Sequence, residues 1–529
     1  MPNNKAVVLG ALLISLTING PALAFNPLES FGQAMQNAVQ QSQQRQAAPQ
    51  QQAAATPPGD LGIAMAGKRQ VVYEGYSKDM LPVKKLLADG QAAQAYQTAL
   101  PQGKSLEELD MLGSLEAGTL AIDAGMLEQA KVGFQKAEMS LDQKDGRSTV
   151  GGFFSGTKDT LLSTLTGNAE LGEYQGAGYE RVLMLNYKSI AHLLDGERAA
   201  YNVTRRAIDL QNIEKKKFDE LVREAREKIA KEEAEQKSKG ADLGSYGLAD
   251  VVEEQYQSTE RQALKVPHAF VNPFGFYIAG VVQELDSYED KSLRDNARIS
   301  YNKALELNPK SDVIKQAAAD MRKPAASNKR LVNVIIADGF APEKKLLKFD
   351  LSLGASLPTV IELPVYEPVD SRVARVEIQT TGGKRWSRAS EVADISALAL
   401  RFQKDAGPIQ QLRMMTTVVR NVIEGQAWNN AQEKAGVFGS VFGKLKEARD
   451  ELAHPDMRSW TTLPSRLLAA RFFVPTSVSR IKIVAFDSRG RQVASELVDI
   501  DKDSHNVVYA RVIDNKIYAS SSKKMWVKS

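Results

Sequence analysis

The sequence predicts an α+β protein, in which an N-terminal α-helical array is followed by an antiparallel β-sandwich-like domain with inserted helices. Between residues 70 and 323, apolar residues recur three and four positions apart, the spacing of one face of a helix. Beyond Pro324 the pattern changes to alternation, as in 372–379 (RVARVEIQ), which is typical of a half-buried strand. A small, polar connector at 324–328 (PAASN) separates the two patterns, so we expect two separable folded units.

The N-terminus has the features of a secretion signal. Lys5 is followed by thirteen apolar or small residues and then by Ala22 and Ala24, whose small side chains suit the pockets of a signal peptidase. A retained membrane anchor is the alternative, but a spanning helix needs roughly 20 apolar residues. We therefore expect residues 1–24 to be a signal peptide and the mature chain to begin at Phe25.

Residues 25–69 are predicted to form a disordered linker rich in Gln, Ala and Pro. Eight glutamines lie between positions 40 and 52, and two prolines follow at 57 and 58. Such a composition cannot bury enough apolar surface to offset the entropy lost on ordering the chain.

Within 70–323, three stretches match a helix–turn–helix unit in which small residues let the second helix approach closely. Their key positions are Ala117, Gly118, Ala121, Gly125, Ala130, Phe134 and Ala137, then Gly196, Ala200, Thr204 and Ala207, and then Ala279, Gly280, Ala297, Tyr301, Ala304 and Pro309. Three matches in register, one with a closing proline, indicate tetratricopeptide-like repeats. A generic helical bundle is the alternative.

Two insertions are expected to interrupt the array. Residues 145–178 are rich in glycine and are predicted to form a long loop with a short helix. Residues 211–238 are predicted to form a highly charged helix, with opposite charges three and four positions apart and only a thin apolar stripe that includes Phe218 and Ile229. We expect a solvated helical extension; a coiled coil with a partner is the alternative.

The mainly β domain is expected over residues 330–515. A turn is predicted at Gly382 and Gly383, inserted helices within 390–455, and a C-terminal tail over 516–529. The predicted strands are 330–337, 359–363, 372–379, 480–486, 492–500 and 506–513.

Composition argues against several classes of function. The chain has no cysteine and therefore no disulfide, lipid-anchor cysteine, thiolate nucleophile or cysteine-based zinc site. Its 68 basic and 64 acidic residues nearly balance, so we expect no nucleic-acid partner. No segment after the signal reaches 18 apolar residues, so we expect no transmembrane segment after cleavage, although peripheral membrane contact stays open.

No catalytic, cofactor-binding or metal-binding residues are predicted. The four histidines are far apart in the sequence and form no zinc-protease motif. No Gly-x-Ser-x-Gly elbow marks a serine nucleophile. Two converging carboxylates could cleave a glycosidic bond, and acids near predicted strand ends are Glu343, Glu362, Glu367 and Asp370. Solvated or helix-capping acids are the simpler interpretation of these four residues.

Two groups of residues resemble a known family. They are 174–182 (YQGAGYERV) with Tyr187 and 205–207 (RRA), and 456–460 (DMRSW) with 463–464 (LP). These stretches are similar to a family of uncharacterised bacterial envelope proteins, often lipoproteins, with tetratricopeptide repeats and a C-terminal β domain. The likeness spans about residues 72–512. It implies this fold and an envelope location but no activity, and this chain lacks the cysteine of a lipoprotein.

These observations predict an exported periplasmic scaffold or adaptor that binds envelope proteins or peptides through the groove of the helical array. Outer-membrane association and secretion are alternative destinations. The expected partner-binding residues are Tyr187, Lys188, Phe276 and Tyr277. Packing of each tyrosine against neighbouring helices is the alternative.

A docking segment is expected at Phe438, Phe442 and Trp460. Tight local packing is the alternative for the two phenylalanines, and anchoring of the inserted helices onto the sheet is the alternative for Trp460. Two other functions stay open: a cell-wall-acting hydrolase, and a structural component of a secretion or surface assembly.

Overall fold

The computed structural model describes several ranges of this chain. All of the described residues except Ser238 belong to one compact unit. The ranges are 71–72, 76–101, 104–144, 174, 176–238, 247–270, 272–325, 329–352, 358–415 and 455–524. The predicted signal peptide and linker (1–69), the core of the glycine-rich insertion (145–173), Phe438 and Phe442 lie outside the described residues.

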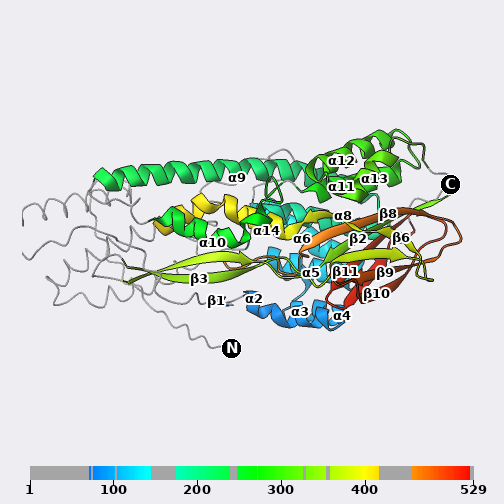
Figure 1. Cartoon of the computed structure of the whole chain (residues 1–529), viewed down its shortest axis with the longest axis horizontal. Helices are drawn as coiled ribbons and strands as arrows, with labels where there is room; N and C mark the ends of the chain where they lie inside the picture. The colour runs from blue at the N-terminus through cyan, green and yellow to red at the C-terminus, as the bar shows by residue number, and fades with distance from the viewer. Residues whose placement is uncertain are drawn as a thin grey trace, which may run out of the picture. The chain divides into compact units, whose positions relative to one another are not determined.

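The described residues form a mixed α+β structure, as the sequence predicts (Figure 1). The helices are α2 (Tyr76–Asp79), α3 (Leu81–Ala88), α4 (Ala92–Ala99), α5 (Met111–Asp123), α6 (Leu127–Lys144), α8 (Gly178–Leu194), α9 (Ala199–Ser238), α10 (Leu248–Ala263), α11 (Pro273–Asp286), α12 (Leu293–Leu307), α13 (Asp312–Asp320) and α14 (Ile395–Asp405). The strands are β1 (Val71–Val72), β2 (Arg330–Asp338), β3 (Glu343–Ser352), β4 (Pro358–Glu367), β5 (Arg375–Gln379), β6 (Arg385–Arg388), β7 (Ser390–Asp394), β8 (Arg466–Val474), β9 (Arg480–Phe486), β10 (Gln492–Asp499), β11 (Asn506–Ile513) and β12 (Lys516–Ser521).

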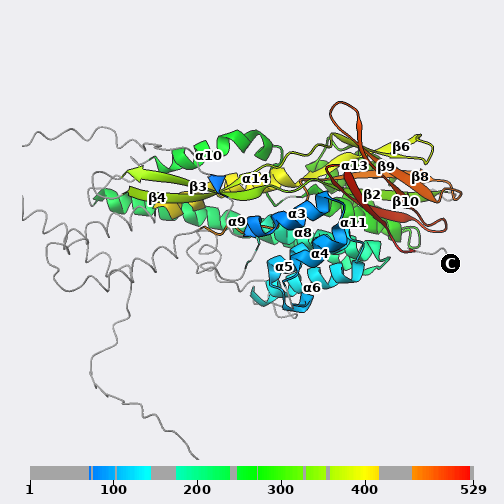
Figure 2. The ribbon, with the colours of Figure 1, turned by 90° about the horizontal axis from the view of Figure 1, so that it is seen from below.

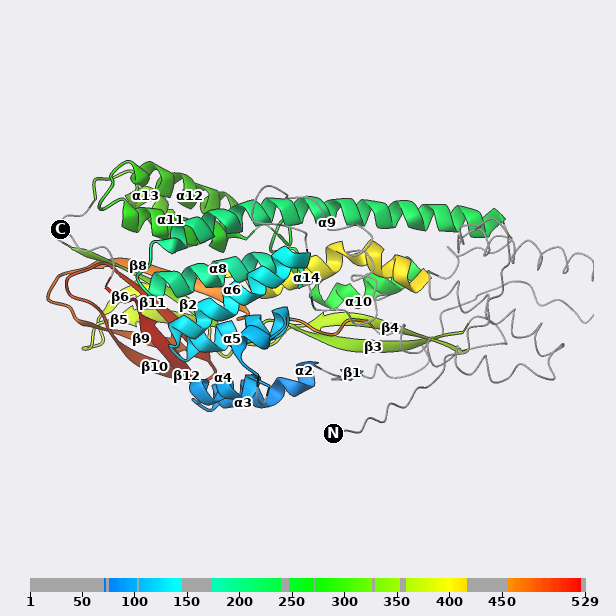
Figure 3. The same cartoon turned by 180° about the vertical axis from the view of Figure 1, so that it is seen from behind.

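Small residues bring paired helices together at the predicted positions. A Cβ built on Gly118 of α5 would lie 2.9 Å from the Phe134 ring of α6, and one built on Gly280 of α11 would lie 2.6 Å from the Tyr301 ring of α12. Each aromatic ring therefore occupies the space that a side chain would take. Figure 3 shows α5, α6 and α8 packed beside one another, in agreement with their contacts.

Two larger sheets lie in the C-terminal half. One has the order β12-β11-β2-β8-β7 and the other β10-β9-β5-β6. The predicted antiparallel pairing is wrong at one place, because β11 runs parallel to β2. Both strands are buried along their whole length, which fits a sheet covered on two faces, where parallel neighbours are common.

Alternate residues of the five-stranded sheet belong to two different cores. Val332 and Val334 of β2 pack in a cluster with Ile481 and Ile483 of β9, which belong to the four-stranded sheet. On the opposite face, residues such as Ile335 join the large cluster formed by the helices. The five-stranded sheet therefore lies between the helices and the second sheet.

Because helices and strands share this large core, the expectation of two units separable near 324–329 does not fit the packing. Three smaller expectations also need correction. Residues 516–521 form β12 and not a tail, and 390–394 form β7 before the first inserted helix begins. The charged segment 211–238 continues α9, a single helix of 40 residues, and is not a separate insertion.

A third sheet, β1-β3-β4, consists mainly of the β3–β4 hairpin (Figure 2). Leu347 and Leu363 of this hairpin share a small apolar cluster with Val252 and Tyr256 of α10 and with Ile229 of α9. The stripe predicted on the charged helix is thus buried inside the molecule at Phe218 and Ile229, which corrects the expectation of a wholly solvated extension.

Candidate functional site

The residues predicted to bind a partner lie inside the fold. Tyr187 and Tyr277 have no exposed surface, Lys188 is 4% exposed, and Phe276 is half-buried against the core. The prediction that Tyr187, Lys188 and Tyr277 face an open groove is therefore wrong, because all three are buried. The alternative of packing inside the fold describes both tyrosines.

The physical reason for the two tyrosines is that the chain's own β sheet covers this face of the helices, whereas Lys188 is buried against α6, where its Nζ donates to Glu138 over 2.6 Å. The Tyr277 hydroxyl points to Asn333 of β2, and the Asp123 carboxylate of α5 accepts a hydrogen bond from Tyr509 of β11. Contacts between α8 and β11 continue the same interface. Sequence spacing can place a residue on a helix face but does not show what covers that face.

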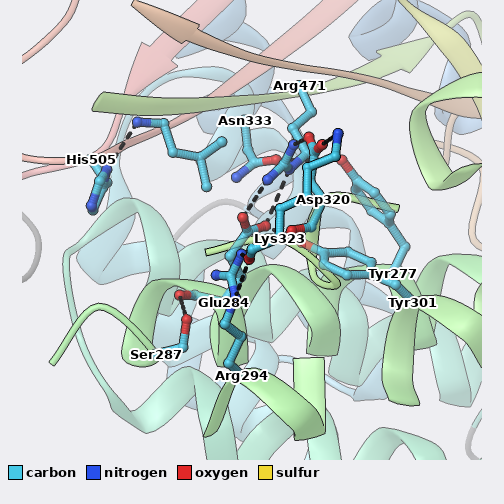
Figure 4. Close-up of polar contacts among 11 residues, drawn as sticks. Tyr277, Glu284, Ser287, Arg294, Tyr301, Asp320, Lys323, Asn333, Arg471 and His505 are labelled. Atoms are coloured by element: carbon cyan, nitrogen blue, oxygen red, sulfur yellow. Dashed lines mark hydrogen bonds and ion pairs between the residues drawn. The ribbon is translucent and has the colours of Figure 1, made fainter. Parts of the chain in front are cut away.

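A buried ion-pair network joins α11 and α13 to β8 (Figure 4). Arg471 donates hydrogen bonds to Glu284, one of them 3.2 Å long, and donates to Asp320 over 2.6 Å. The Tyr301 hydroxyl donates to Glu284 over 2.8 Å. Burial alone would lower the pKa of Arg471, but the charge and hydrogen bonds of Glu284 outweigh it and raise that pKa.

Trp460 is also part of the core and not an exposed docking residue, which corrects its predicted role. Its indole N–H donates to Thr119 of α5 over 3.0 Å, and its ring contacts Phe134 and Tyr187. The backbone N–H of Trp460 donates to the carboxylate of Glu180 over 2.9 Å. Trp460 therefore anchors the segment before β8 to the helices.

The neighbouring threonines complete this anchor. The backbone N–H groups of Thr461 and Thr462 donate to Glu116 of α5 over 2.7 and 3.0 Å, and both hydroxyls donate to the same carboxylate. Burial raises the pKa of Glu116, and the four hydrogen bonds oppose that rise. The arrangement satisfies buried polar groups and presents no open reaction site.

Three of the four acids considered for hydrolysis pair with lysines, although Glu343 and Glu367 are opposite each other on β3 and β4. Glu343 pairs with Lys84 of α3, Glu362 with Lys348, and Glu367 with Lys345. Among the described residues, no group of three or more His, Asp or Glu side chains is placed to hold a metal ion.

A cleft of about 590 Å³ opens between α9, α10 and α14, a volume within the range usual for ligand pockets. Its apolar lining includes Phe218, Val252 and Tyr256. Figure 1 shows the three helices side by side. No sequence pattern singles out this cleft, although Val252 and Tyr256 have the i, i+4 spacing of one helical face.

The rim of the cleft carries charges of both signs. Arg401 pairs with Asp405 over 2.8 Å, and Lys404 of α14 pairs with Glu260 of α10. Arg226 of α9 is exposed at the rim. Glu253 of α10 is exposed there too, and neither residue has a side-chain partner within the described ranges.

His268 closes one end of the cleft, where its Nε2 lies 3.1 Å from Asp219 of α9. The rim thus carries positive and negative side chains around an apolar floor. Such a rim is complementary to a segment of mixed charge and gives no advantage to a polyanion.

Comparisons with protein-family models, with curated proteins and with solved structures found no match. The helices within the described ranges include none that is both long and apolar enough to cross a membrane.

Proposed function

We propose that this protein is an exported scaffold of the bacterial cell envelope that binds a peptide or protein segment in the cleft between α9, α10 and α14. The cleft is the observation that carries the proposal, because it combines an apolar floor with exposed charges at Arg226 and Glu253. The N-terminal signal pattern of residues 1–24 supports export to the periplasm.

The proposal includes the finer description of the fold, a tetratricopeptide-like array with a β-sandwich. The close approaches at Gly118 and Gly280 support the array. The cluster shared by β2 and β9 supports the sandwich. In this description the concave side of the array holds the protein's own sheet, so the partner site moves to the cleft beside the long helix α9.

Site-specific photo-cross-linking in intact envelopes tests the proposal. A photoreactive residue replaces Gln257, which is exposed in the cleft, and the matched control replaces Ile299, which is exposed on α12. We expect a discrete protein adduct from position 257 that the double charge reversal R226E/E253R abolishes. Equal adducts from both positions, or an adduct that ignores the charge reversal, would contradict the proposal.

A further inference from the structure

A second, smaller cavity of about 90 Å³ shares one lining residue, Tyr256, with the cleft. A water molecule needs roughly 10–15 Å³ of such space, so the cavity holds a solute of several non-hydrogen atoms. Its polar lining comes from α10, β3, β4, α14 and the helical residues 407–415. The side chains that matter are Tyr256, Lys344, Tyr366, Gln403, Gln410 and Arg413.

Three residues that line this cavity each carry a buried polar atom with no hydrogen-bond partner in the described part of the chain. These atoms are the Tyr256 hydroxyl, Gln403 Nε2 and Gln410 Oε1. The Gln403 amide is oriented by its own Oε1, which accepts a hydrogen bond from the backbone N–H of Tyr366. Its Nε2 is therefore the group left free to donate.

Leaving such atoms unpaired costs stability, about 1–3 kcal/mol for each buried group. A folded chain rarely keeps several of them around one space. Their convergence here indicates a site prepared for a polar ligand that supplies the missing partners.

Two cationic side chains, Lys344 and Arg413, line the cavity together with the carboxylate of Asp456, and the charge of Glu362 also acts on Arg413. Lys344 Nζ donates to the backbone carbonyls of Asp456 and Arg458 over 3.2 and 2.8 Å, and its charge also lies near the Asp456 carboxylate and helps to lower the pKa of that group. The Asp456 carboxylate is occupied by Arg458, over 2.9 Å. Arg413 is 7% exposed, and burial lowers its pKa to about 10, so it stays protonated at neutral pH.

We propose that this cavity binds an α-amido carboxylate, the group that ends a peptide chain or an acylated amino acid. Tyr256 and Gln403 donate to the carboxylate, while Lys344 and Arg413 supply the opposite charge. Gln410 Oε1 accepts the N–H beside the carboxylate. The Tyr366 ring bounds the site with apolar surface. This inference stands independently of the cleft, because it uses a different set of polar groups.

Calorimetric titration of the full-length protein tests the ligand chemistry. N-acetylglycine and trialanine represent the free acid and the peptide end. The neutral N-acetylglycinamide and amidated trialanine are their controls. We expect saturable binding of at least one acid and at least tenfold weaker binding of its amide, since hydrogen bonds to a charged group contribute about 1.5–3 kcal/mol. No saturable binding of either acid, or equal binding of acid and amide, would overturn the proposal.

Two substitutions test the residues. Tyr256→Phe removes only the unpartnered hydroxyl, so it should weaken acid binding about tenfold while the free energy of unfolding stays the same or rises. Gln410→Met should weaken binding in the same way. Tyr288→Phe is the matched control, because the Tyr288 hydroxyl is also buried without a partner in the described chain but lies beside His505, outside this cavity.

Unchanged acid binding in both Tyr256→Phe and Gln410→Met, or an equal loss in Tyr288→Phe, would refute the assignment. The R226E/E253R variant separates this site from the cleft. It should abolish the photo-adduct at position 257 and leave acid binding unchanged.

Discussion

The Tyr509 hydroxyl of β11 donates a 2.9 Å hydrogen bond to the Asp123 carboxylate of α5, and this contact links the first predicted helix pair to the five-stranded sheet. The second carboxylate oxygen of Asp123 lies 3.9 Å from Arg511 Nε, with both side chains fully buried. Burial raises the pKa of Asp123 to about 6, although Arg511 and Tyr509 oppose that rise.

This pKa makes stability depend on pH in a defined direction. The unfolded chain releases the Asp123 proton near pH 4, whereas the folded protein keeps it until about pH 6. The folded state thus binds more protons in this window, and the free energy of unfolding falls as pH rises through it, by at most about 1.4 kcal/mol per pH unit.

Urea unfolding at several pH values between 4 and 7 checks this effect. Asp123→Asn removes the titrating group and should flatten the decline relative to the wild type. Asp209→Asn, at an exposed position on α9, should keep the wild-type slope. A slope in Asp123→Asn as steep as in the wild type would show that another group controls this pH range.

The Arg471–Glu284 pair predicts a large loss on removing one partner. Glu284→Gln leaves Arg471 buried with only Asp320 as a charged partner and should lower the free energy of unfolding by about 3 kcal/mol. The exposed pair Arg198–Glu289 gives the control, since Glu289→Gln should cost less than about 1 kcal/mol. Urea titration at neutral pH measures both.

Replacing both members with apolar residues sharpens this test. The double variant E284L/R471M leaves no unpaired buried charge, so it should be more stable than Glu284→Gln. If the double variant is less stable than Glu284→Gln, the lost contacts to Tyr301 and Asp320 reduce the free energy of unfolding more than an uncompensated Arg471 charge does.

Local patterns were sufficient to predict the elements whose neighbours are close in sequence. The predicted strands 480–486 and 506–513 have the bounds of β9 and β11, and Gly280 with Tyr301 marked a true helix pair. β8 (RLLAARFFV) is not among the strands predicted from alternation, because a continuous apolar run does not distinguish a strand buried on both faces from a buried helix.

The candidate sites were harder to predict because they depend on long-range packing. Tyr187 and Tyr277 were chosen as mixed aromatic and polar positions on helix faces, yet the sheet that covers those faces comes much later in the chain. Similarly, Tyr256 and Gln403 have no sequence relationship that would bring them to one cavity. No periodicity within a helix contains this information.

Gly280 should tolerate no side chain. A Cβ there would lie 2.6 Å from two atoms of the Tyr301 ring, which is fully buried and held by its hydrogen bond to Glu284. Overpacking costs about 1–3 kcal/mol, and the better helix propensity of Ala returns only about 1 kcal/mol. Gly280→Ala should therefore destabilise the protein in urea, whereas Gly382→Ala, with its nearest atom 3.8 Å away, should not. Wild-type stability in Gly280→Ala would contradict the close approach.

The last strand predicts that the C-terminal residues are essential for stability. β12 pairs with β11 from Ile513↔Lys516 to Val508↔Ser521, and Tyr518 donates to the backbone carbonyl of Leu87 in α3. The backbone N–H of Lys523 donates to the carbonyl of Leu194 in α8 over 2.8 Å.

A chain that ends at Asn515 loses these contacts and leaves the edge of β11 unpaired beside the core. Because each unpaired buried backbone group costs about 1–3 kcal/mol, we expect a loss of more than about 3 kcal/mol in the free energy of unfolding. A chain that ends at Lys524 keeps every described contact of β12 and is the matched control. Thermal and urea unfolding measure the stability of the two chains. Equal stability would mean that residues 516–524 act as the tail that their sequence suggests. A large difference would assign these residues to the sheet that holds the helices in place.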